Sequence, residues 1–193
     1  MESEMKTVVI TGSTRGIGLG LAREFLQRGH QVIISGTSEQ SVANALEQLK
    51  GLGDMIGQPC RVEDYEAVQN LWNKGFERFG KIDIWINNAG ISTSKTILDE
   101  LALDEIHNTI DTNLIGSILC TKIAAKEMLK QGFGQIYMFE GFGSNGQLQK
   151  GITVYGSTKR ALRYFTAAAA NEYKDTPILI GSLSPGIVTT DLL

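Results

Sequence analysis

The chain has 193 residues, of which 42% are hydrophobic and 20% charged, and its formal net charge is −3 at pH 7. This length is enough for a single domain with a substantial core, and the lack of a basic run or an aromatic stripe argues against nucleic acid as a partner. No apolar stretch reaches transmembrane length and the first four residues carry no basic targeting signal, so we expect a soluble, cytoplasmic protein that does not bind membranes.

Short apolar segments alternate with helical segments from end to end of the chain. The expected strands are residues 7–11, 32–35, 55–60, 82–87, 135–139 and 178–183, and the expected long helices are residues 41–50, 65–79, 114–129 and 155–173. Such alternation predicts one α/β domain over residues 1–193. We expect a Rossmann-type, doubly wound parallel sheet in the order 3-2-1-4-5-6 with helices on both faces.

A glycine-rich loop, residues 11–18 (TGSTRGIG), follows the first strand. Ile17, Leu21, Ala22 and Phe25 then recur at helical spacing, which places the loop at a strand-to-helix turn. Backbone N–H groups at such a helix start favour a phosphate, and glycines let a pyrophosphate approach the main chain. The loop therefore indicates a nucleotide site, although glycines also close ordinary turns.

Tyr155 and Lys159 stand four residues apart in a segment of helical character. Residues i and i+4 share a helix face with Cβ atoms roughly 6 Å apart, so the Lys159 ammonium can lie close to whatever the Tyr155 phenol acts upon. The alternative is an exposed pair on a helix. A tyrosine so placed is a candidate general acid.

Cys60 and Cys120 lie far apart and lack the spacing of metal ligands. We expect both to be buried, reduced thiols, and we expect no bound metal.

These motifs and others in the same order make the chain resemble the main type of the short-chain dehydrogenase/reductase family. The others are Asn87-Asn88-Ala89-Gly90, Asn113 with Gly116, and Pro185-Gly186 with Thr190. The resemblance implies an NAD(P)-dependent interconversion of a carbonyl and an alcohol. The cofactor contacts it implies are Gly12, Ser13, Thr14, Arg15, Gly16, Ile17, Gly18, Thr37, Ser38, Arg61, Val62, Asn88, Ala89, Gly90, Tyr155, Lys159, Pro185, Gly186, Val188 and Thr190.

The same resemblance implies the roles of the catalytic residues. Tyr155 would protonate the carbonyl oxygen, and Lys159 would hold the nicotinamide ribose. Lys159 and an oxidised nicotinamide would both lower the pKa of Tyr155 from its ordinary value near 10. Asn113 would anchor a water, the alternative being a helix cap.

The residues after the second expected strand favour NADP(H) over NAD(H). An NAD enzyme usually carries an acid there, whereas this chain has Gly36 followed by Thr37 and Ser38. Arg15 would add a positive charge for a 2′-phosphate, unless it is a solvated surface side chain. Arg61 departs from the family pattern, and it would either stack on the adenine or point to solvent.

The catalytic serine is a second departure, because the position at which the resemblance places it holds Phe142. Ser144 is the nearest hydroxyl and either takes that role or caps the loop. The surrounding Glu140-Gly141-Phe142-Gly143-Ser144 segment is most similar to the chlorophyll b reductase-like branch. The Thr37-Ser38-Glu39 turn is instead similar to 3-oxoacyl-carrier-protein reductases.

The family pattern continues beyond Thr190 with a substrate-covering helix pair and a seventh strand, which the 193 residues do not contain. Three functions compete on this basis. The first is an NADPH-dependent carbonyl reductase and the second is a non-catalytic NADP-binding sensor or scaffold. The third is a reductase that acts only with another chain supplying the lid.

The helices expected at residues 114–129 and 155–173 also bear on assembly. The alanines from Ala167 to Ala170 make the second helix apolar on more than one side, so it needs a partner besides the sheet unless both helices bury everything within one subunit. The resemblance implies that these helices pair with their copies across a two-fold axis. We expect a homodimer, possibly a homotetramer, which Ala169→Glu would weaken if that residue faces the partner.

Overall fold

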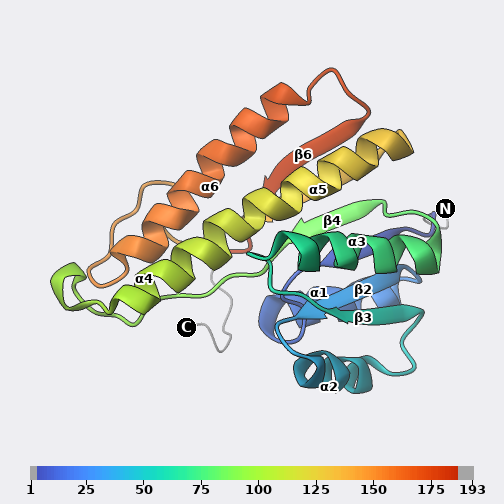
Figure 1. Ribbon diagram of the computed structural model, residues 1–193, viewed down its shortest axis with the longest axis horizontal. Coiled ribbons are helices and arrows are strands. Elements are labelled where there is room, and N and C mark those ends of the chain that lie inside the picture. The colour runs from blue at the N-terminus through green and yellow to red at the C-terminus, as the bar shows by residue number, and fades with distance from the viewer. Residues whose placement is uncertain (1–3, 187–193) are drawn as a thin grey trace.

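A computed structural model of the chain describes residues 4–186. Six parallel strands form one sheet in the order β3-β2-β1-β4-β5-β6, which confirms the predicted order (Figure 1). The strands are β1 (Thr7–Ile10), β2 (Gln31–Gly36), β3 (Met55–Pro59), β4 (Ile84–Asn87), β5 (Gly134–Phe139) and β6 (Ile178–Leu183). Each lies within two residues of its predicted bounds.

Six α-helices connect or flank the strands. They are α1 (Gly16–Gln27), α2 (Glu39–Leu49), α3 (Tyr65–Phe79), α4 (Leu103–Ile110), α5 (Gly116–Gln131) and α6 (Thr153–Glu172). A 3₁₀ turn, η1 (Leu98–Glu100), precedes α4, and a π-helical segment, η2 (Asp111–Ile115), joins α4 to α5. The prediction began this helix at residue 114, whereas the continuous helical run that contains α5 begins at Leu103.

The helices cover both faces of the sheet, as the three-layer prediction requires. Side chains of α1 and α2, including Leu26 and Leu49, pack on one face, while α3 and α5 pack on the other. Trp72 of α3 stacks on Trp85 of β4 with ring centroids 6.0 Å apart. Burial of each large apolar side chain contributes roughly 1.5–3 kcal/mol.

Both cysteines lie in the core between the sheet and the α3 and α5 layer. They are buried and form no disulfide, and burial raises the pKa of the Cys60 thiol to about 12. Buried, reduced thiols were predicted at these positions.

Ala169 is 6% exposed and belongs to the core under α6. Ala169 therefore does not face a partner, which was the condition on which Ala169→Glu was expected to weaken the dimer. The helix turns Ala169 toward the sheet and leaves Ala167 on its outer side.

None of the helices within residues 4–186 is long and apolar enough to cross a membrane. The same residues contain no group of three His, Cys, Asp or Glu side chains placed to hold a metal ion. All six strands point their carboxyl ends toward one edge of the sheet, where ligands of open α/β sheets bind.

Candidate active site

A cavity of about 820 Å³ opens at the carboxyl edge of the sheet. It is lined by the loops that follow β1 to β6 and by the first turns of α6. The glycine loop and the Tyr155–Lys159 pair, more than a hundred residues apart in sequence, thus face one space. The predicted site residues that line it are Gly12, Thr14, Arg15, Gly16, Ile17, Gly18, Thr37, Arg61, Val62, Asn88, Ala89, Gly90, Tyr155, Lys159, Pro185 and Gly186.

Four of the predicted site residues that the structure describes are not among the lining residues. Ser13, Ser38, Asn113 and Ser144 are described by the structure but face elsewhere. Val188 and Thr190 lie outside the described residues.

The glycine loop is shaped by close approach of the main chain. Gly12 has φ +61°, and a Cβ built there would lie 2.8 Å from the Ala89 Cα, so no other residue fits without strain. A Cβ on Gly18 would lie 2.5 Å from the Asn88 Nδ2. That amide donates to the carbonyl oxygens of Thr11 and Gly12, at 2.9 and 3.0 Å. The bare main chain at the start of α1 is a cradle that fits a phosphate group.

Thr11 and Ser13 hold this loop in place through hydrogen bonds outside the cavity, which neither of them lines. The Thr11 Oγ1 accepts hydrogen bonds from the backbone N–H groups of Asn88 and Ala89, both at 3.0 Å, and so ties the end of β1 to the end of β4. The Ser13 Oγ donates to the Ile10 carbonyl oxygen at 2.7 Å and accepts from the Ser35 N–H at 2.9 Å. Ser13 is thus a turn residue, and its predicted cofactor contact is not supported by its placement.

The end of β2 forms another part of the wall, with Thr37 and Ser41 on the cavity side. Ser38 instead caps α2, because its Oγ accepts from the Ser41 N–H at 3.2 Å. The sequence analysis missed Ser41, which has no motif of its own. Arg15 is exposed at the cavity and has no ion-pair partner within residues 4–186.

Arg61 lies at the rim of the cavity, where 64% of its side chain is exposed. Its guanidinium is paired with Glu63 at 2.6 Å. The neighbouring Val62 is buried, and a Cβ on Gly116 would lie 2.5 Å from the Val62 Cγ2. Gly116 therefore allows α5 to pack against the loop that follows β3.

Tyr155 and Lys159 lie together at the inner end of the cavity, on the first turns of α6. The Lys159 Nζ is 5.7 Å from the centre of the Tyr155 ring and donates to the Phe139 carbonyl oxygen at 3.3 Å. Burial lowers the pKa of Lys159 to about 8 and raises the pKa of Tyr155. The pKa of Tyr155 was expected to fall beside Lys159 and an oxidised nicotinamide, and in the protein by itself burial of the phenol raises it instead.

Gly141, which the sequence analysis did not single out, packs closely against Tyr155 and Lys159. A Cβ built at Gly141 would lie 2.5 Å from the Tyr155 phenol oxygen and 3.1 Å from the Lys159 Cε. Only glycine leaves room for the phenol in this position. The Gly-Phe-Gly pattern of the loop was the available signal, but sequence does not reveal which glycine faces which side chain.

Ser144 does not take the position of a catalytic serine. It is 5% exposed, and its Oγ donates to the Glu140 carboxylate at 3.1 Å. The other carboxylate oxygen of Glu140 accepts from the Ser182 Oγ of β6 at 2.9 Å. Ser144 therefore fastens its loop to the end of β5, which agrees with the loop-capping alternative.

Asn113 is fully buried in the π-helical segment between α4 and α5, so it is not a helix cap. Its side chain donates to the Ile91 carbonyl oxygen at 2.9 Å and accepts from the Ile91 N–H at 2.8 Å. It also donates to the Thr158 Oγ1, one residue before Lys159, at 3.2 Å. Asn113 thus joins the loop after β4 to α6. π-Helical turns inside α-helices are frequent at functional sites.

Comparison with known proteins agrees with this geometry. A family model described as short chain dehydrogenase matches residues 6–193. The chain is 40% identical over 97% of its length to a probable chloroplastic chlorophyll(ide) b reductase of Arabidopsis thaliana, and it covers 42% of that protein. It is 32% identical over 97% of its length to a 3alpha-hydroxysteroid dehydrogenase of Mediterraneibacter gnavus, and it covers 76% of that protein. The expected similarity to the chlorophyll b reductase-like branch is confirmed.

Solved structures show the same fold. An ElxO variant with NADPH bound has a TM-score of 0.88 at 32% identity, with 97% of this chain and 76% of that one covered. A Burkholderia phymatum short chain dehydrogenase/reductase in complex with NAD has a TM-score of 0.92 at 22% identity, with 100% and 69% covered. The chain spans about half the length of the chlorophyll(ide) b reductases it matches, from 41% to 57%.

Proposed function

The chain belongs to the short chain dehydrogenase family, and from this premise we propose that it is an NADPH-dependent reductase that interconverts a carbonyl and an alcohol. The observation that carries the proposal is one cavity lined by both the glycine loop and the Tyr155–Lys159 pair. A bound nicotinamide cofactor supplies or accepts the hydride.

The proton is transferred by residues of the protein itself. Burial raises the pKa of Tyr155, so the phenol holds its proton at neutral pH and can donate it to an oxygen that gains negative charge. Lys159, with a pKa of about 8, is mostly charged at pH 7 and stabilises the phenolate that remains. Gly141 leaves the phenol oxygen free of side-chain contact from the loop.

NADPH is proposed as the cofactor in preference to NADH. The wall after β2 has Gly36 and Thr37 in place of an acid, and Arg15 lines the same cavity. An anionic 2′-phosphate would meet these donors and no carboxylate of β2. Solved structures of similar fold contain either NAD or NADPH and do not decide between the two cofactors. The preference for NADPH therefore rests on the residues of this chain.

A second candidate function is supported by the placement of Ser144. Because its hydroxyl is bound to Glu140 and does not line the cavity, Ser144 does not present a hydroxyl beside Tyr155. The protein would then be an NADP-binding sensor or scaffold without turnover. NADPH oxidation measured across a panel of aldehydes and ketones separates the two. Stoichiometric NADPH binding with no oxidation by any carbonyl would favour the sensor.

We also propose a homodimer formed through α5 and α6. Both helices lie on one side of the sheet, and Ile115 at the end of η2 and Leu129 of α5 are 41% and 39% exposed on its outer face. Leu119, on the same face, is half-buried. Apolar outer faces on two neighbouring helices suit a self-complementary contact around a two-fold axis.

A further inference from the structure

The phenol of Tyr155 is held in place by packing. Within residues 4–186 its oxygen makes no hydrogen bond, and the nearby Lys159 donates instead to the Phe139 carbonyl oxygen at 3.3 Å. On the side of the loop after β5 the phenol packs against Gly141, where a Cβ would lie 2.5 Å from the phenol oxygen. The residues that fix Gly141 therefore also fix where the phenol can lie.

The residue before that glycine, Glu140, is bound through both of its carboxylate oxygens. Oε2 accepts a hydrogen bond from the Ser144 Oγ at 3.1 Å, and Oε1 accepts one from the Ser182 Oγ of β6 at 2.9 Å. The Glu140 backbone N–H also donates to the Leu183 carbonyl oxygen at 2.8 Å. We call residues 140–144 the Glu140 loop, because this one side chain joins the two ends of the loop to each other and to β6.

The Glu140 loop also touches α6 next to Tyr155. Gly143 has φ +93°, and a Cβ built there would lie 2.8 Å from the Gly156 Cα, so the two main chains meet one residue beyond Tyr155. The Ser144 N–H donates to the Gly141 carbonyl oxygen at 3.1 Å, which closes the loop into a tight turn. The loop thus contacts both the phenol and the helix that carries it.

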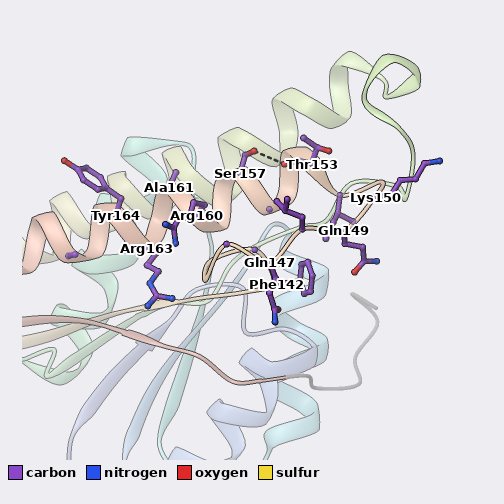
Figure 2. A pocket seen from close by; sticks show the side chains of 16 residues that line it. Phe142, Gln147, Gln149, Lys150, Thr153, Ser157, Arg160, Ala161, Arg163 and Tyr164 are labelled. Atoms are coloured by element: carbon purple, nitrogen blue, oxygen red, sulfur yellow. Dashed lines mark hydrogen bonds between the residues drawn. The ribbon is translucent and has the colours of Figure 1, made fainter.

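Glu140 holds the loop through hydrogen bonds more than through its charge. Its side chain is only 12% exposed, so a lost hydrogen bond is not readily replaced by water. Figure 2 shows Arg163 projecting from α6 toward the strands, but its Nη1 lies 3.9 Å from the Glu140 Oε2 and half of its side chain is exposed. A long and partly solvated ion pair of this kind contributes little.

On the basis of the proposed function, we propose that Glu140 is a positioning residue for Tyr155. Its carboxylate holds Gly141 against the phenol oxygen by binding the Glu140 loop to β6. Phe142 has no hydroxyl and that of Ser144 is bound to Glu140, so neither side chain orients the phenol by a hydrogen bond. Support from surrounding residues matters for a proton donor, because a displacement of about 1 Å can cost roughly 10²-fold in rate.

The kinetic test compares Glu140→Ala with Glu140→Gln, because glutamine can still form hydrogen bonds with both serine hydroxyls. In Glu140→Ala we expect kcat to fall by at least about tenfold while KM for NADPH stays within about twofold, and glutamine should recover most of the loss. Two controls should match the wild type: Arg163→Gln, and Glu172→Ala at an exposed position at the end of α6. An unchanged kcat in Glu140→Ala, or equal losses in both Glu140 variants, overturns the inference.

Carbon NMR of isotopically labelled tyrosines separates failure of this inference from failure of the reductase proposal. The ring resonance of Tyr155, assigned by its loss in Tyr155→Phe, reports the surroundings of the phenol whether or not a carbonyl is reduced. It should move in Glu140→Ala and stay close to its wild-type position in Glu140→Gln and Glu172→Ala.

A shifted resonance without turnover supports the positioning role and rejects the reductase. A wild-type resonance in folded Glu140→Ala overturns the positioning role even if the reductase proposal holds. Should Glu140→Ala not fold, Ser182→Ala takes its place in both assays, because it removes one of the two hydrogen bonds to the carboxylate. It should then change kcat and the Tyr155 resonance in the same directions, and no change in either overturns the inference.

Discussion

Gly141 occupies the space where a side chain would meet the Tyr155 phenol oxygen, only 2.5 Å from the position of its Cβ. Gly141→Ala should therefore displace the phenol and lower kcat by about 10²-fold, the effect of a misplacement near 1 Å. The affinity for NADPH, measured by fluorescence titration, should change little because the glycine loop is untouched. Gly20→Ala is the matched control, since nothing lies within 4 Å of that Cβ. An unchanged kcat in Gly141→Ala would show that the phenol position is not critical.

The charge of Lys159 works against folding. Its pKa of about 8 lies below the ordinary 10.5, so below pH 8 the buried ammonium costs on the order of 3 kcal/mol. Lys159→Met should be more stable than the wild type at pH 7. The difference should narrow as pH rises from 8 to 10.5, because folded Lys159 is then neutral while the unfolded chain still binds the proton.

Urea unfolding of the wild type and Lys159→Met at pH 7 and again between pH 8 and 10.5 measures this difference. Lys174→Met, at an exposed position, should show no comparable gain. A difference that does not change with pH would mean that Lys159 is not destabilised by burial.

Arg15 is predicted to select NADPH. Arg15→Gln should weaken NADPH by roughly 10- to 100-fold and leave NADH nearly unchanged, because only the 2′-phosphate requires the charge. Equilibrium titration with both cofactors measures the ratio, with Arg23→Gln, an exposed residue further along α1, as the control. Gly36→Asp is a poorer test, since a Cβ there would lie 2.5 Å from the Thr14 Cγ2. Equal losses for both cofactors would place the 2′-phosphate elsewhere.

Residues whose roles follow from a motif could be predicted from the sequence, as Tyr155 and Lys159 were. The roles of the serine hydroxyl groups were harder to predict. Ser38 and Ser144 suit a ligand chemically, yet both are bound within the protein, one by a helix N-terminus and one by Glu140. Gly141 acts by leaving space, and only the folded chain shows what fills that space.

At the level of elements, the helical run from α4 through η2 to α5 was the main omission. Residues 103–110 expose most of their side chains, with Leu103 at 73%, although Leu103, Ile106 and Ile110 recur at helical spacing and were an available signal. Asp111, Thr112 and Asn113 are weak helix formers. Tertiary contacts decide the conformation here, because Asn113 holds the π-helical segment against Ile91 and Thr158.

The outer face of α5 provides the test of the homodimer. Leu119→Glu should place a charge in the proposed contact and shift the protein toward monomers, because an unpaired charge at an apolar interface is costly. Sedimentation at micromolar concentration measures the shift, and Leu98→Glu on the exposed turn η1 is the control. Ala169→Glu should instead destabilise the fold, since Ala169 faces the core. A monomeric wild type that is folded and binds NADPH would reject the dimer.

For the whole molecule, the order of the sheet followed from the alternation of strands and helices, because right-handed crossovers leave few arrangements of six parallel strands. That order brings the ends of β1, β4 and β5 to one edge and so predicts that the glycine loop and Tyr155 meet. The second cavity, which lies between residues 142–150 and the flank of α6, could not be predicted, because it depends on how that loop folds back along the helix.

The central claim is that the chain reduces carbonyl compounds with NADPH and that Tyr155 supplies the proton. It is tested most directly by NADPH oxidation across a carbonyl panel in the wild type, Tyr155→Phe and the control Tyr65→Phe. We expect the wild type and Tyr65→Phe to turn over at similar rates. Tyr155→Phe should lose at least about 10²-fold in kcat with its NADPH affinity retained, because the ring stays and only the proton is removed. Near-normal turnover in Tyr155→Phe, or no turnover by a wild type that binds NADPH, would contradict the account.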